Sequence, residues 1–467
     1  MKHKNEALRA ERSLLSTILC FALPLIATSL LQLVFNTADT IMVGRWGGST
    51  PEECTAAMAA VGSCTSLVNL FVNATIGLSV GCGIAVAHRA TKGREGELST
   101  IIHTGVTLAA FIGIGVLLVG ALLARPILRA MDTDTAVLSD AVAYFRVYLF
   151  GMPACVVYNF CAATLRARGD TVRPLIFLSI GGACNVILNA IAVVGLQMGA
   201  VGVGLATAAS QWLSCSLVLV YMMRTTGEYR LFLRSLGIRR AALSAILAAG
   251  VPAAVQSMLF NLSALILQSA VNGFGTAVVA GNTAAMNLEG YIYTTQNALY
   301  HTAMMLIARA LGAGDLTRIG RVKRISTVTV GVVGITVGMT VFLLSTPLLS
   351  LYVPESAEAL HAGCVRLATV APVYFLCGMM EVGSGSLRGM GRSLLPTFVS
   401  LVGCCVLRVV WVMTLFRILA PTLTLDWALC LLYLCFPISW LLTALIQHLL
   451  AARELCRLKK RVAPGEV

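Results

Sequence analysis

The stretch LPLIATSLLQLVFNTADTIMVG, Leu23–Gly44, decides what kind of fold this chain adopts. It is long enough to cross a bilayer as a helix, and Asp39 is its one acidic residue. A carboxylate at that depth is costly to bury, and such residues usually line a cavity or an ion path. A bound proton or cation offsets this cost. Asp39 therefore predicts a membrane protein whose function is coupled to a cation.

Apolar segments of similar length recur along all 467 residues. The chain is 58% hydrophobic and 12% charged, about half the charged fraction of a soluble domain. Gly and Pro inside the segments are typical of spanning helices that pack on one another. We predict an all-α membrane protein with twelve transmembrane helices, at approximately 15–44, 55–87, 98–124, 137–163, 174–196, 198–223, 241–272, 277–308, 325–352, 362–387, 394–416 and 427–450.

The formal net charge of +14 comes mainly from alternate loops, beginning with the N-terminal stretch MKHKNEALRAERS. This distribution is the positive-inside pattern and predicts that both termini are cytoplasmic. We therefore interpret the excess of basic residues as a signal for membrane topology, with a contribution from binding to lipid headgroups. We expect no nucleic-acid partner. The fifteen cysteines lie almost entirely in apolar segments without metal-ligand spacing, which predicts buried free thiols.

The chain repeats itself. LPLIATSLLQ around Pro24 is similar to VPAAVQSMLF around Pro252, and LRARGDTVRP (165–174) is similar to LRGMGRSLLP (387–396). Six spans in each half give both halves the same orientation, so we predict two six-helix bundles related by a pseudo-two-fold axis along the membrane normal. The predicted domains are an N-lobe (1–225, spans 1–6), a cytoplasmic linker (226–240) and a C-lobe (241–467, spans 7–12).

A cation site is predicted around Asp39, whose segment contains no Lys or Arg. Asn185 and Asn189 are four residues apart in span five and therefore share a helix face. Their amides offer oxygens to Na⁺ or hydrogen bonds to a protonated carboxyl, and Thr207 of span six is a third polar partner. The alternative is that these asparagines only bond one helix to another.

A second polar group lies in span eight around Glu289, a candidate titrating or drug-binding acid. Gln296 and Tyr300 are expected on its face, while His301 lies further round the helix as either a proton relay or a packing residue. Nearby tyrosines are able to stack on a planar cation or to pack at the interface. The predicted substrate site, or second polar site, consists of Gln32, Asn36, Glu289, Gln296, Tyr300 and His301.

Arginines also occur within the segments. Arg146 and Arg366 are expected to snorkel from the outer ends of spans four and ten, and Arg408 to pair with Glu381. The chain has no GxxxxGK[ST] motif and no paired catalytic constellation. We therefore expect neither an enzyme nor direct drive by ATP, with no metal centre and no cofactor beyond a coupling ion.

These motifs together resemble a known family. The segments QLVFNTADTIMVG (32–44), AAVG (59–62), LRARGDTVRP, NVILNAIAVVG (185–195) and AAMNLEGYIY (284–293) are similar to the multidrug and toxic compound extrusion (MATE) transporters, with DinF-like features in the N-lobe. The resemblance implies that Asp39 is the first-helix acid of the N-lobe cation site. Asn185 and Thr207 match its span-five and span-six partners, and Asn189 stands where some members carry Asp.

The resemblance implies a secondary active multidrug efflux antiporter of the bacterial cell (inner) membrane. It would exchange cytoplasmic organic compounds, often cationic, for extracellular H⁺ or Na⁺, and if the ion is Na⁺ it is expected at Asp39 and Asn185. Expected partners are small-molecule drugs or toxic metabolites and the lipid bilayer, with the protein acting as a monomer. The stretch after Glu289 lacks the family's usual Pro, which implies a shifted substrate range, and Glu381 matches no family acid.

Two alternatives are open. A lipid-linked precursor flippase of the same superfamily would need a cationic central cavity, for which Arg146, Arg366 and Arg408 are candidates. A sensor or receptor would need an extramembrane domain to report binding, and the longest polar stretch runs only from about Arg224 to Arg240.

Overall fold

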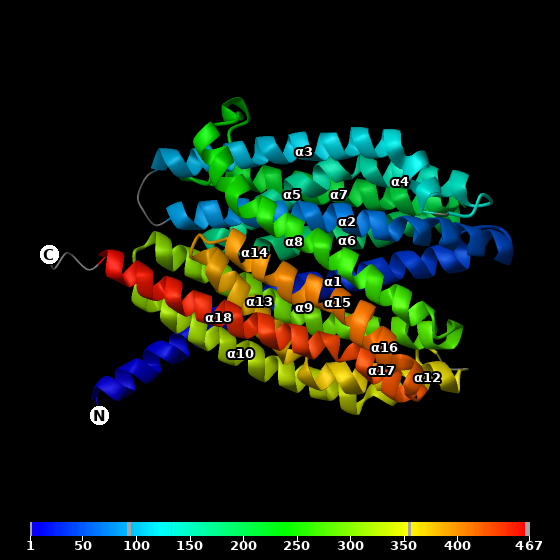
Figure 1. Ribbon diagram of the computed structural model, residues 1–467. Coiled ribbons are helices and arrows are strands. Elements are labelled where there is room, and N and C mark those ends of the chain that lie inside the picture. Colours follow the sequence, from blue (N-terminus) through cyan, green and yellow to red (C-terminus); the bar gives the residue numbers. More distant parts are fainter. Residues whose placement is uncertain (1, 91–94, 132, 354–355, 463–467) are drawn as a thin grey trace. The chain divides into compact units, whose positions relative to one another are not determined.

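The computed structural model describes residues 2–90, 95–131, 133–353 and 356–462, and these ranges contain helices and no strand (Figure 1). In chain order the elements are α1 (Lys2–Trp46), α2 (Pro51–Arg89), α3 (Glu95–Ala130), α4 (Leu138–Phe150), α5 (Met152–Arg168), α6 (Val172–Asn189), η1 (Ala190–Gly195), α7 (Gly199–Arg224), η2 (Leu233–Ser235), α8 (Arg240–Asn272), α9 (Thr276–Gly312), α10 (Leu316–Leu343), α11 (Ser345–Ser350), α12 (Ala357–Val370), η3 (Ala371–Val373), α13 (Phe375–Gly389), α14 (Leu394–Ser400), η4 (Leu401–Val406), α15 (Leu407–Trp411), η5 (Val412–Phe416), α16 (Arg417–Leu419), η6 (Ala420–Thr422), α17 (Leu425–Tyr433) and α18 (Cys435–Val462).

The helices confirm an all-α protein that crosses a membrane several times. Within the described ranges, nine helices are long and apolar enough to span, or up to eleven if each bent pair forms one span. Helix α9, which covers the predicted span 277–308, is not among them because it carries Asn282, Glu289, Gln296 and other polar residues. The count of twelve spans therefore remains a prediction.

Two of the predicted spans are bent. Helices α4 and α5 meet at an angle of 41° within predicted span four, and α12–η3 meets α13 at 47° within predicted span ten. Pro153 follows the first break by two residues, and Pro372 lies in η3 at the second. Proline lacks a backbone donor and clashes with the preceding turn, which explains a bend at each site. The bends fall at matching places in the two sequence repeats.

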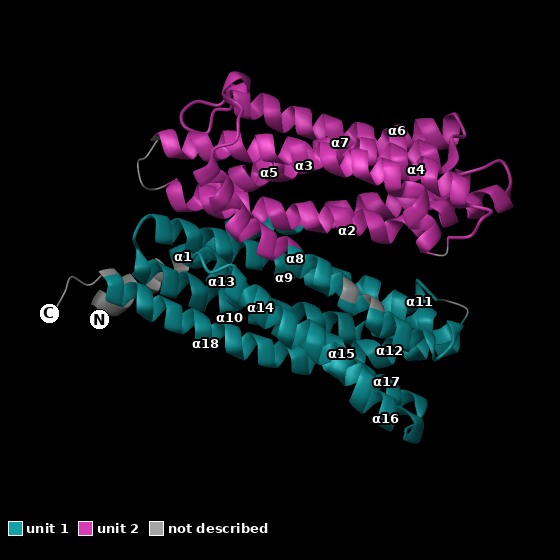
Figure 2. Cartoon of the chain, turned by 45° about the horizontal axis from the view of Figure 1, so that its top comes forward, with its two compact units in different colours: residues 1–26, 255–467 teal, residues 27–254 magenta. Residues whose placement is uncertain are grey.

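The chain forms two compact units (Figure 2). Unit 1 comprises residues 1–26 and 255–467, and unit 2 comprises residues 27–254. In unit 2, α5 packs against α2, α3 and α7; in unit 1, α13 packs against α9, α10 and α18. Since α5 and α13 carry the repeated LRxxG motif, each repeat packs its equivalent helix among equivalent neighbours. The unit boundaries fall inside α1 and α8, and the lobes 1–225 and 241–467 stay a prediction.

Small residues allow close helix contacts inside each unit. A Cβ placed on Gly281 of α9 would lie 2.0 Å from the carbonyl oxygen of Ala359 and 2.9 Å from the backbone nitrogen of Gly363, both on α12. In unit 2, a Cβ on Gly81 would lie 2.2 Å from the carbonyl oxygen of Ile246. Membrane helices use such residues because lipid provides no hydrophobic drive for their association.

The segment between α7 and α8 is held to α3. His103, which is buried, donates from Nδ1 to the Ser99 carbonyl (2.7 Å), so its Nε2 accepts from the backbone N–H of Phe232 (3.0 Å). The Phe232 ring stacks on the imidazole at 6.3 Å between centroids. The backbone N–H of Arg239 also donates to Thr104 Oγ1 (3.3 Å). These contacts order the polar stretch that the sequence places between spans six and seven.

Candidate functional site: a polar cavity around Asp39

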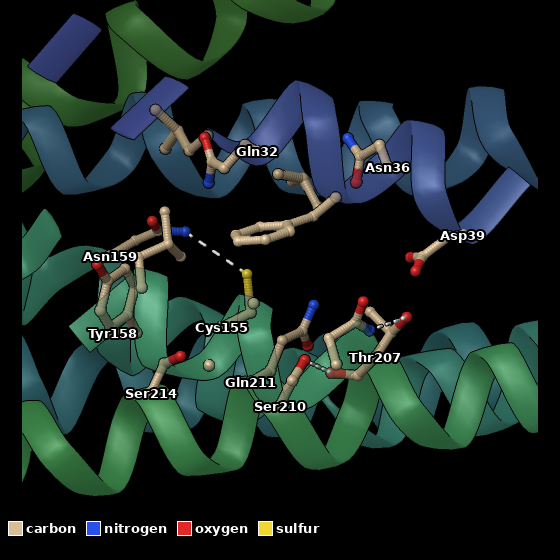
Figure 3. A pocket seen from close by; sticks show the side chains of 17 residues that line it. Gln32, Asn36, Asp39, Cys155, Tyr158, Asn159, Thr207, Ser210, Gln211 and Ser214 are labelled. Atoms are coloured by element: carbon tan, nitrogen blue, oxygen red, sulfur yellow. Dashed lines mark hydrogen bonds between the residues drawn. The ribbon is translucent and has the colours of Figure 1, made fainter. Parts of the chain in front are cut away.

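Unit 2 contains a partly open cavity of about 140 Å³ accessible to water, with walls from α1, α2, α5, α6 and α7 (Figure 3). Its size allows several water molecules or a hydrated cation. Of the residues that line it, Asp39 is the acid, and none is a Lys or Arg. The lining consists of Gln32, Phe35, Asn36, Asp39, Val72, Ile76, Cys155, Tyr158, Asn159, Leu178, Gly181, Gly182, Asn185, Thr207, Ser210, Gln211 and Ser214.

The four residues of the predicted cation site come together here. Asn189 Nδ2 donates to Asp39 Oδ1 at 2.5 Å and to Asn185 Oδ1 at 3.3 Å. Asn185 Nδ2 donates to Thr207 Oγ1 at 3.4 Å, and the Thr207 hydroxyl donates to the Val203 carbonyl at 2.9 Å. One chain of hydrogen bonds therefore runs from the Asp39 carboxylate of α1 through the two amides of α6 to Thr207 of α7.

The backbone at Asn189 changes type. Helix α6 ends at this residue and continues as the π-helix η1, a distortion that is frequent at functional sites. The Asn189 side chain is fully buried, and its Oδ1 has no hydrogen-bond partner. An unpaired buried amide oxygen beside a carboxylate is costly in free energy, and a cation or water would satisfy it.

Gln32 and Asn36 line the same cavity as Asp39, from the same helix α1. Sequence reasoning missed the wall contributed by α5, which supplies Cys155, Tyr158 and Asn159. Residues 155 and 159 share a face at i and i+4. This periodicity was a usable signal, since these polar residues interrupt an otherwise apolar segment.

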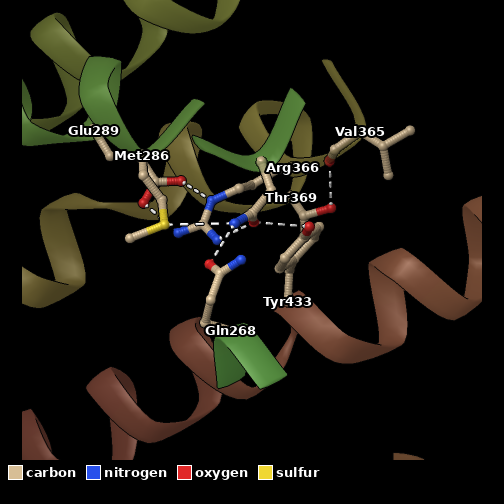
Figure 4. Close-up of polar contacts among 8 residues, drawn as sticks. Gln268, Met286, Glu289, Val365, Arg366, Thr369 and Tyr433 are labelled. Atoms are coloured by element: carbon tan, nitrogen blue, oxygen red, sulfur yellow. Dashed lines mark hydrogen bonds and ion pairs between the residues drawn. The ribbon is translucent and has the colours of Figure 1, made fainter. Parts of the chain in front are cut away.

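The C-lobe candidates do not form one site. Glu289 of α9 makes a bidentate ion pair with Arg366 of α12, with Oε1–Nε at 2.7 Å and Oε2–Nη2 at 2.8 Å (Figure 4). Arg366 Nη1 also donates to Asn282 Oδ1 (2.7 Å), which accepts from the Tyr433 hydroxyl (3.0 Å). Asn282 Nδ2 in turn donates to Gln268 Oε1 at 3.0 Å. The acid is thus neutralised by a guanidinium whose three nitrogens each donate a hydrogen bond.

The other residues predicted near Glu289 have different surroundings. Gln296 is 1% exposed, and neither atom of its amide has a partner. The Tyr300 hydroxyl accepts from Arg388 Nη1 at 2.6 Å. His301 packs its ring against that of Tyr300, with centroids 4.7 Å apart. Glu289, Gln296 and Tyr300 all lie on α9, and their sharing of one functional site stays a prediction.

Two expectations for the arginines are wrong. Arg366 does not snorkel, since it is 5% exposed and bound to Glu289. Arg408 does not pair with Glu381: it donates to Ser439 Oγ (3.0 Å) and lies 4.4 Å from the Phe436 ring centroid. Arg146 is exposed, as snorkelling requires, and its Nε donates to the Ala121 carbonyl at 3.1 Å.

No metal centre is found in the parts of the chain that the structure describes: no three His, Cys, Asp or Glu residues lie close enough together to hold an ion. The fifteen cysteines are free, and most are buried or half-buried.

A known family matches both halves of the chain. The family model described as MatE matches residues 24–191 and again residues 252–414, beginning at Pro24 and at Pro252 of the two repeats. This chain belongs to the MATE family of multidrug efflux transporters. The double match also reproduces the internal repeat that the sequence predicts.

Curated relatives of this MATE protein are named as drug-resistance proteins. The probable multidrug resistance protein YoeA of Bacillus subtilis is 26% identical over 388 residues, covering 82% of each chain. The probable multidrug resistance protein NorM of Thermotoga maritima is 23% identical over 387 residues, covering 81% of this chain and 82% of the relative.

Solved structures match the fold of this MATE protein over nearly its whole length. An outward-facing multidrug-resistance MATE transporter has a TM-score of 0.87 at 20% identity, covering 96% of this chain and 97% of that one. A transporter of the same superfamily from Pyrococcus furiosus has a TM-score of 0.86 at 19% identity, covering 96% and 97%. At these identities the likeness establishes the fold alone.

Proposed function

We propose that this protein is a secondary active antiporter that expels organic compounds from the cytoplasm in exchange for extracellular H⁺ or Na⁺. One observation carries the proposal: Asp39 lies in a polar cavity, hydrogen-bonded to an amide and without a basic partner among the described residues. Such a carboxylate gains most from binding a proton or a cation. The names of the relatives support drug-like substrates.

The cycle uses Asp39 as the group that changes charge. In the inward-facing state Asp39 holds no cation, and the substrate enters from the cytoplasm. In the outward-facing state it takes up H⁺ or Na⁺ from outside, and the filled site favours helix positions that release the substrate. A ligand shifts such an equilibrium only by its different affinity for the two states. Opposed affinities for substrate and cation are therefore sufficient.

The residues around Asp39 suit either coupling ion. Na⁺ is a hard cation that prefers oxygen ligands, and the cluster offers the carboxylate, the amide oxygens of Asn185 and Asn189 and the Thr207 hydroxyl. A proton needs only the carboxylate, with the Asn189 amide as donor to its charged form. Asn189 stands where the family resemblance allows an Asp. With an amide at this position, the site carries the single negative charge of Asp39.

The cavity lining also favours cationic substrates. Asp39 gives it negative charge, while Phe35 and Tyr158 supply aromatic rings beside the amides of Gln32 and Asn36. Organic cations bind aromatic faces and carboxylates together. We propose that the residues that bind the substrate also trigger its release. A cation bound at Asp39 removes the negative charge that attracts the substrate.

The flippase alternative loses support from the arginines. It needs a cationic cavity, yet Arg366 is neutralised by Glu289 and Arg408 lies against Phe436 and Ser439. Arg146 is engaged with a backbone carbonyl. We further propose that the protein is a monomer, has no enzymatic activity and lies in the bacterial cell membrane. Its two lobes carry six spans each, and both termini are cytoplasmic.

Dye efflux from everted or energised vesicles tests the function. Wild type, Asp39→Asn and the control Asp140→Asn, an exposed acid of α4, are compared while the pH and Na⁺ gradients are collapsed separately. We expect efflux to be lost in Asp39→Asn and on collapse of one gradient, and to persist in the control. Intact gradient-driven efflux in Asp39→Asn would refute the proposal.

A further inference from the structure

The proposed cycle leaves a second buried acid unused. Glu381 lies in the middle of α13 and is 5% exposed, and Arg388 lies seven residues further along the same helix face, also buried. Within the described ranges, no residue forms a hydrogen bond or an ion pair with Glu381. A buried carboxylate without a partner is costly in its charged form, and binding a proton removes that cost.

The Tyr300 hydroxyl connects the acid with the arginine. Arg388 Nη1 donates to the Tyr300 oxygen at 2.6 Å, and the charges of both Glu381 and Arg388 act on this hydroxyl. Because the oxygen accepts from Arg388, the hydroxyl proton of Tyr300 is free to be donated. The ring is held in place by Gly385, where a Cβ would lie 2.9 Å from it.

Arg388 keeps one donor in reserve. Its Nη2 donates to Gln256 Oε1 (2.7 Å) and to Thr397 Oγ1 (3.3 Å), while its buried Nε has no hydrogen-bond partner. Gln296, on the same helix as Tyr300, likewise has an amide with both atoms unpaired. Buried donors that remain unpaired are rare in native proteins, and they indicate a state in which a partner is present.

The internal repeat aligns Glu381 with a residue that lines the cavity of unit 2. Aligning LRARG with LRGMG sets Glu381 opposite Asn159 and Cys377 opposite Cys155. Asn159 and Cys155 both line the cavity around Asp39. The second repeat therefore carries an acid where the first repeat carries an amide in its cavity wall.

We propose that Glu381 is a second proton-binding site, with Arg388, acting through the Tyr300 hydroxyl, as the counter-charge of its ionised form. This inference rests on the proposed antiport cycle and assigns H⁺ to the second lobe. On release, the carboxyl O–H bond breaks and the proton leaves to water. The carboxylate then moves toward the free Nε of Arg388 and accepts from the Tyr300 hydroxyl of α9, and this bond to Tyr300 draws α13 against α9.

The groups that face Glu381 are consistent with a proton rather than a metal ion. On the helices packed against α13, α18 carries His448, whose Nε2 lies 2.9 Å from the Met379 carbonyl, and α10 carries Lys323, which donates to the His448 carbonyl at 3.0 Å, so both are engaged with backbone carbonyls rather than with Glu381. Thiols and phenols are poor Na⁺ ligands compared with carbonyls and carboxylates. The titratable and charged groups around Glu381 are Tyr293 and Tyr300 of α9, Cys377 and Arg388 of α13, and Cys404 of η4.

Infrared difference spectroscopy of the purified protein in lipid vesicles tests this site directly. Spectra at mildly acidic minus mildly alkaline pH report the C=O stretch of protonated carboxyls. We expect Glu381→Gln to lose one component of this band, Asp39→Asn to lose none of that component, and the exposed control Glu358→Gln to match wild type. A Glu381→Gln spectrum identical to wild type overturns the proposal.

A second variant covers the case in which Glu381→Gln does not fold. Tyr300→Phe keeps the acid but removes the bridging hydroxyl, so the pH midpoint of the Glu381 component should move; an unchanged midpoint also overturns the proposal. The proposed function fails separately, because Asp39→Asn with intact dye efflux would refute antiport at Asp39 whatever the Glu381 band shows.

Discussion

The ion pair between Glu289 and Arg366 provides a quantitative test of how unit 1 is stabilised. The guanidinium makes two hydrogen bonds to the carboxylate, at 2.7 and 2.8 Å, and a third to Asn282 at 2.7 Å. Both residues are buried, with Glu289 6% and Arg366 5% exposed. Arg366→Met removes the cation and leaves the carboxylate buried without compensation, which costs about 3–5 kcal/mol.

Glu289→Gln leaves the opposite charge behind. Arg366 keeps Asn282 and the ring of Tyr433, whose centroid lies 5.0 Å from the guanidinium carbon. We therefore expect a smaller loss, about 2–3 kcal/mol, since a hydrogen bond to a charged group is worth about 1.5–3 kcal/mol. The double variant removes both charges, so its unfolding free energy should return to within about 1 kcal/mol of wild type.

Reversible unfolding in mixed micelles measures all four proteins of this cycle. The expected outcome is a coupling energy of about 3 kcal/mol or more between the two substitutions. Each single variant leaves one buried charge without its partner, whereas the double variant contains neither charge. Additive losses would show that the ion pair does not stabilise the fold through its charges. A loss below about 1 kcal/mol for Arg366→Met would contradict the burial argument.

Three further predictions concern the cation site and contacts within each unit. Asn189→Ala removes the hydrogen bond to Asp39, worth about 1.5–3 kcal/mol, and we expect gradient-driven dye efflux in vesicles to slow by about tenfold or more. Gly281→Ala forces α9 and α12 apart, so thermal unfolding in detergent should show a loss of about 1–3 kcal/mol, whereas Gly290→Ala, with open space at its Cβ, should show little change. His103→Phe removes the acceptor for the Phe232 N–H, worth about 1 kcal/mol, and trypsin should cut the segment between α7 and α8 about fivefold faster; an unchanged rate would mean that this contact does not hold the segment.

The sequence predicted those features that depend on one segment at a time. Hydropathy located the helices because each must satisfy its own backbone in lipid. The i, i+4 spacing of Asn185 and Asn189 placed two amides on one face, and their contact with Asp39 follows from helices that pack side by side. The register of the repeat was visible in the sequence because the LRxxG motif stands at the C-terminal end of two equivalent helices, α5 and α13.

Features that depend on tertiary partners were not predictable in the same way. Glu289 and Arg366 are 77 residues apart, and nothing in either segment specifies the other as its partner. The sequence pairs Arg408 with Glu381 because their spans are neighbours in sequence. In the structure Arg408 instead donates to Ser439 and lies over the ring of Phe436, both on α18. Which of several neighbouring helices faces a given side chain depends on helix rotation, and apolar composition on all sides leaves that rotation unspecified.

The distribution of charge separates acids that can exchange an ion from acids that cannot. Glu289 is neutralised by Arg366, and releasing it would cost about 3–5 kcal/mol, which a coupling ion would have to supply in every cycle. Asp39 has no such partner among the described residues and lies in a water-accessible cavity, so in the proposed cycle a cation binds there without breaking an ion pair. A coupling site must bind and release its ion on each turn, and small opposing free energies favour this. Of these two acids, Asp39 meets that requirement and Glu289 stabilises the fold.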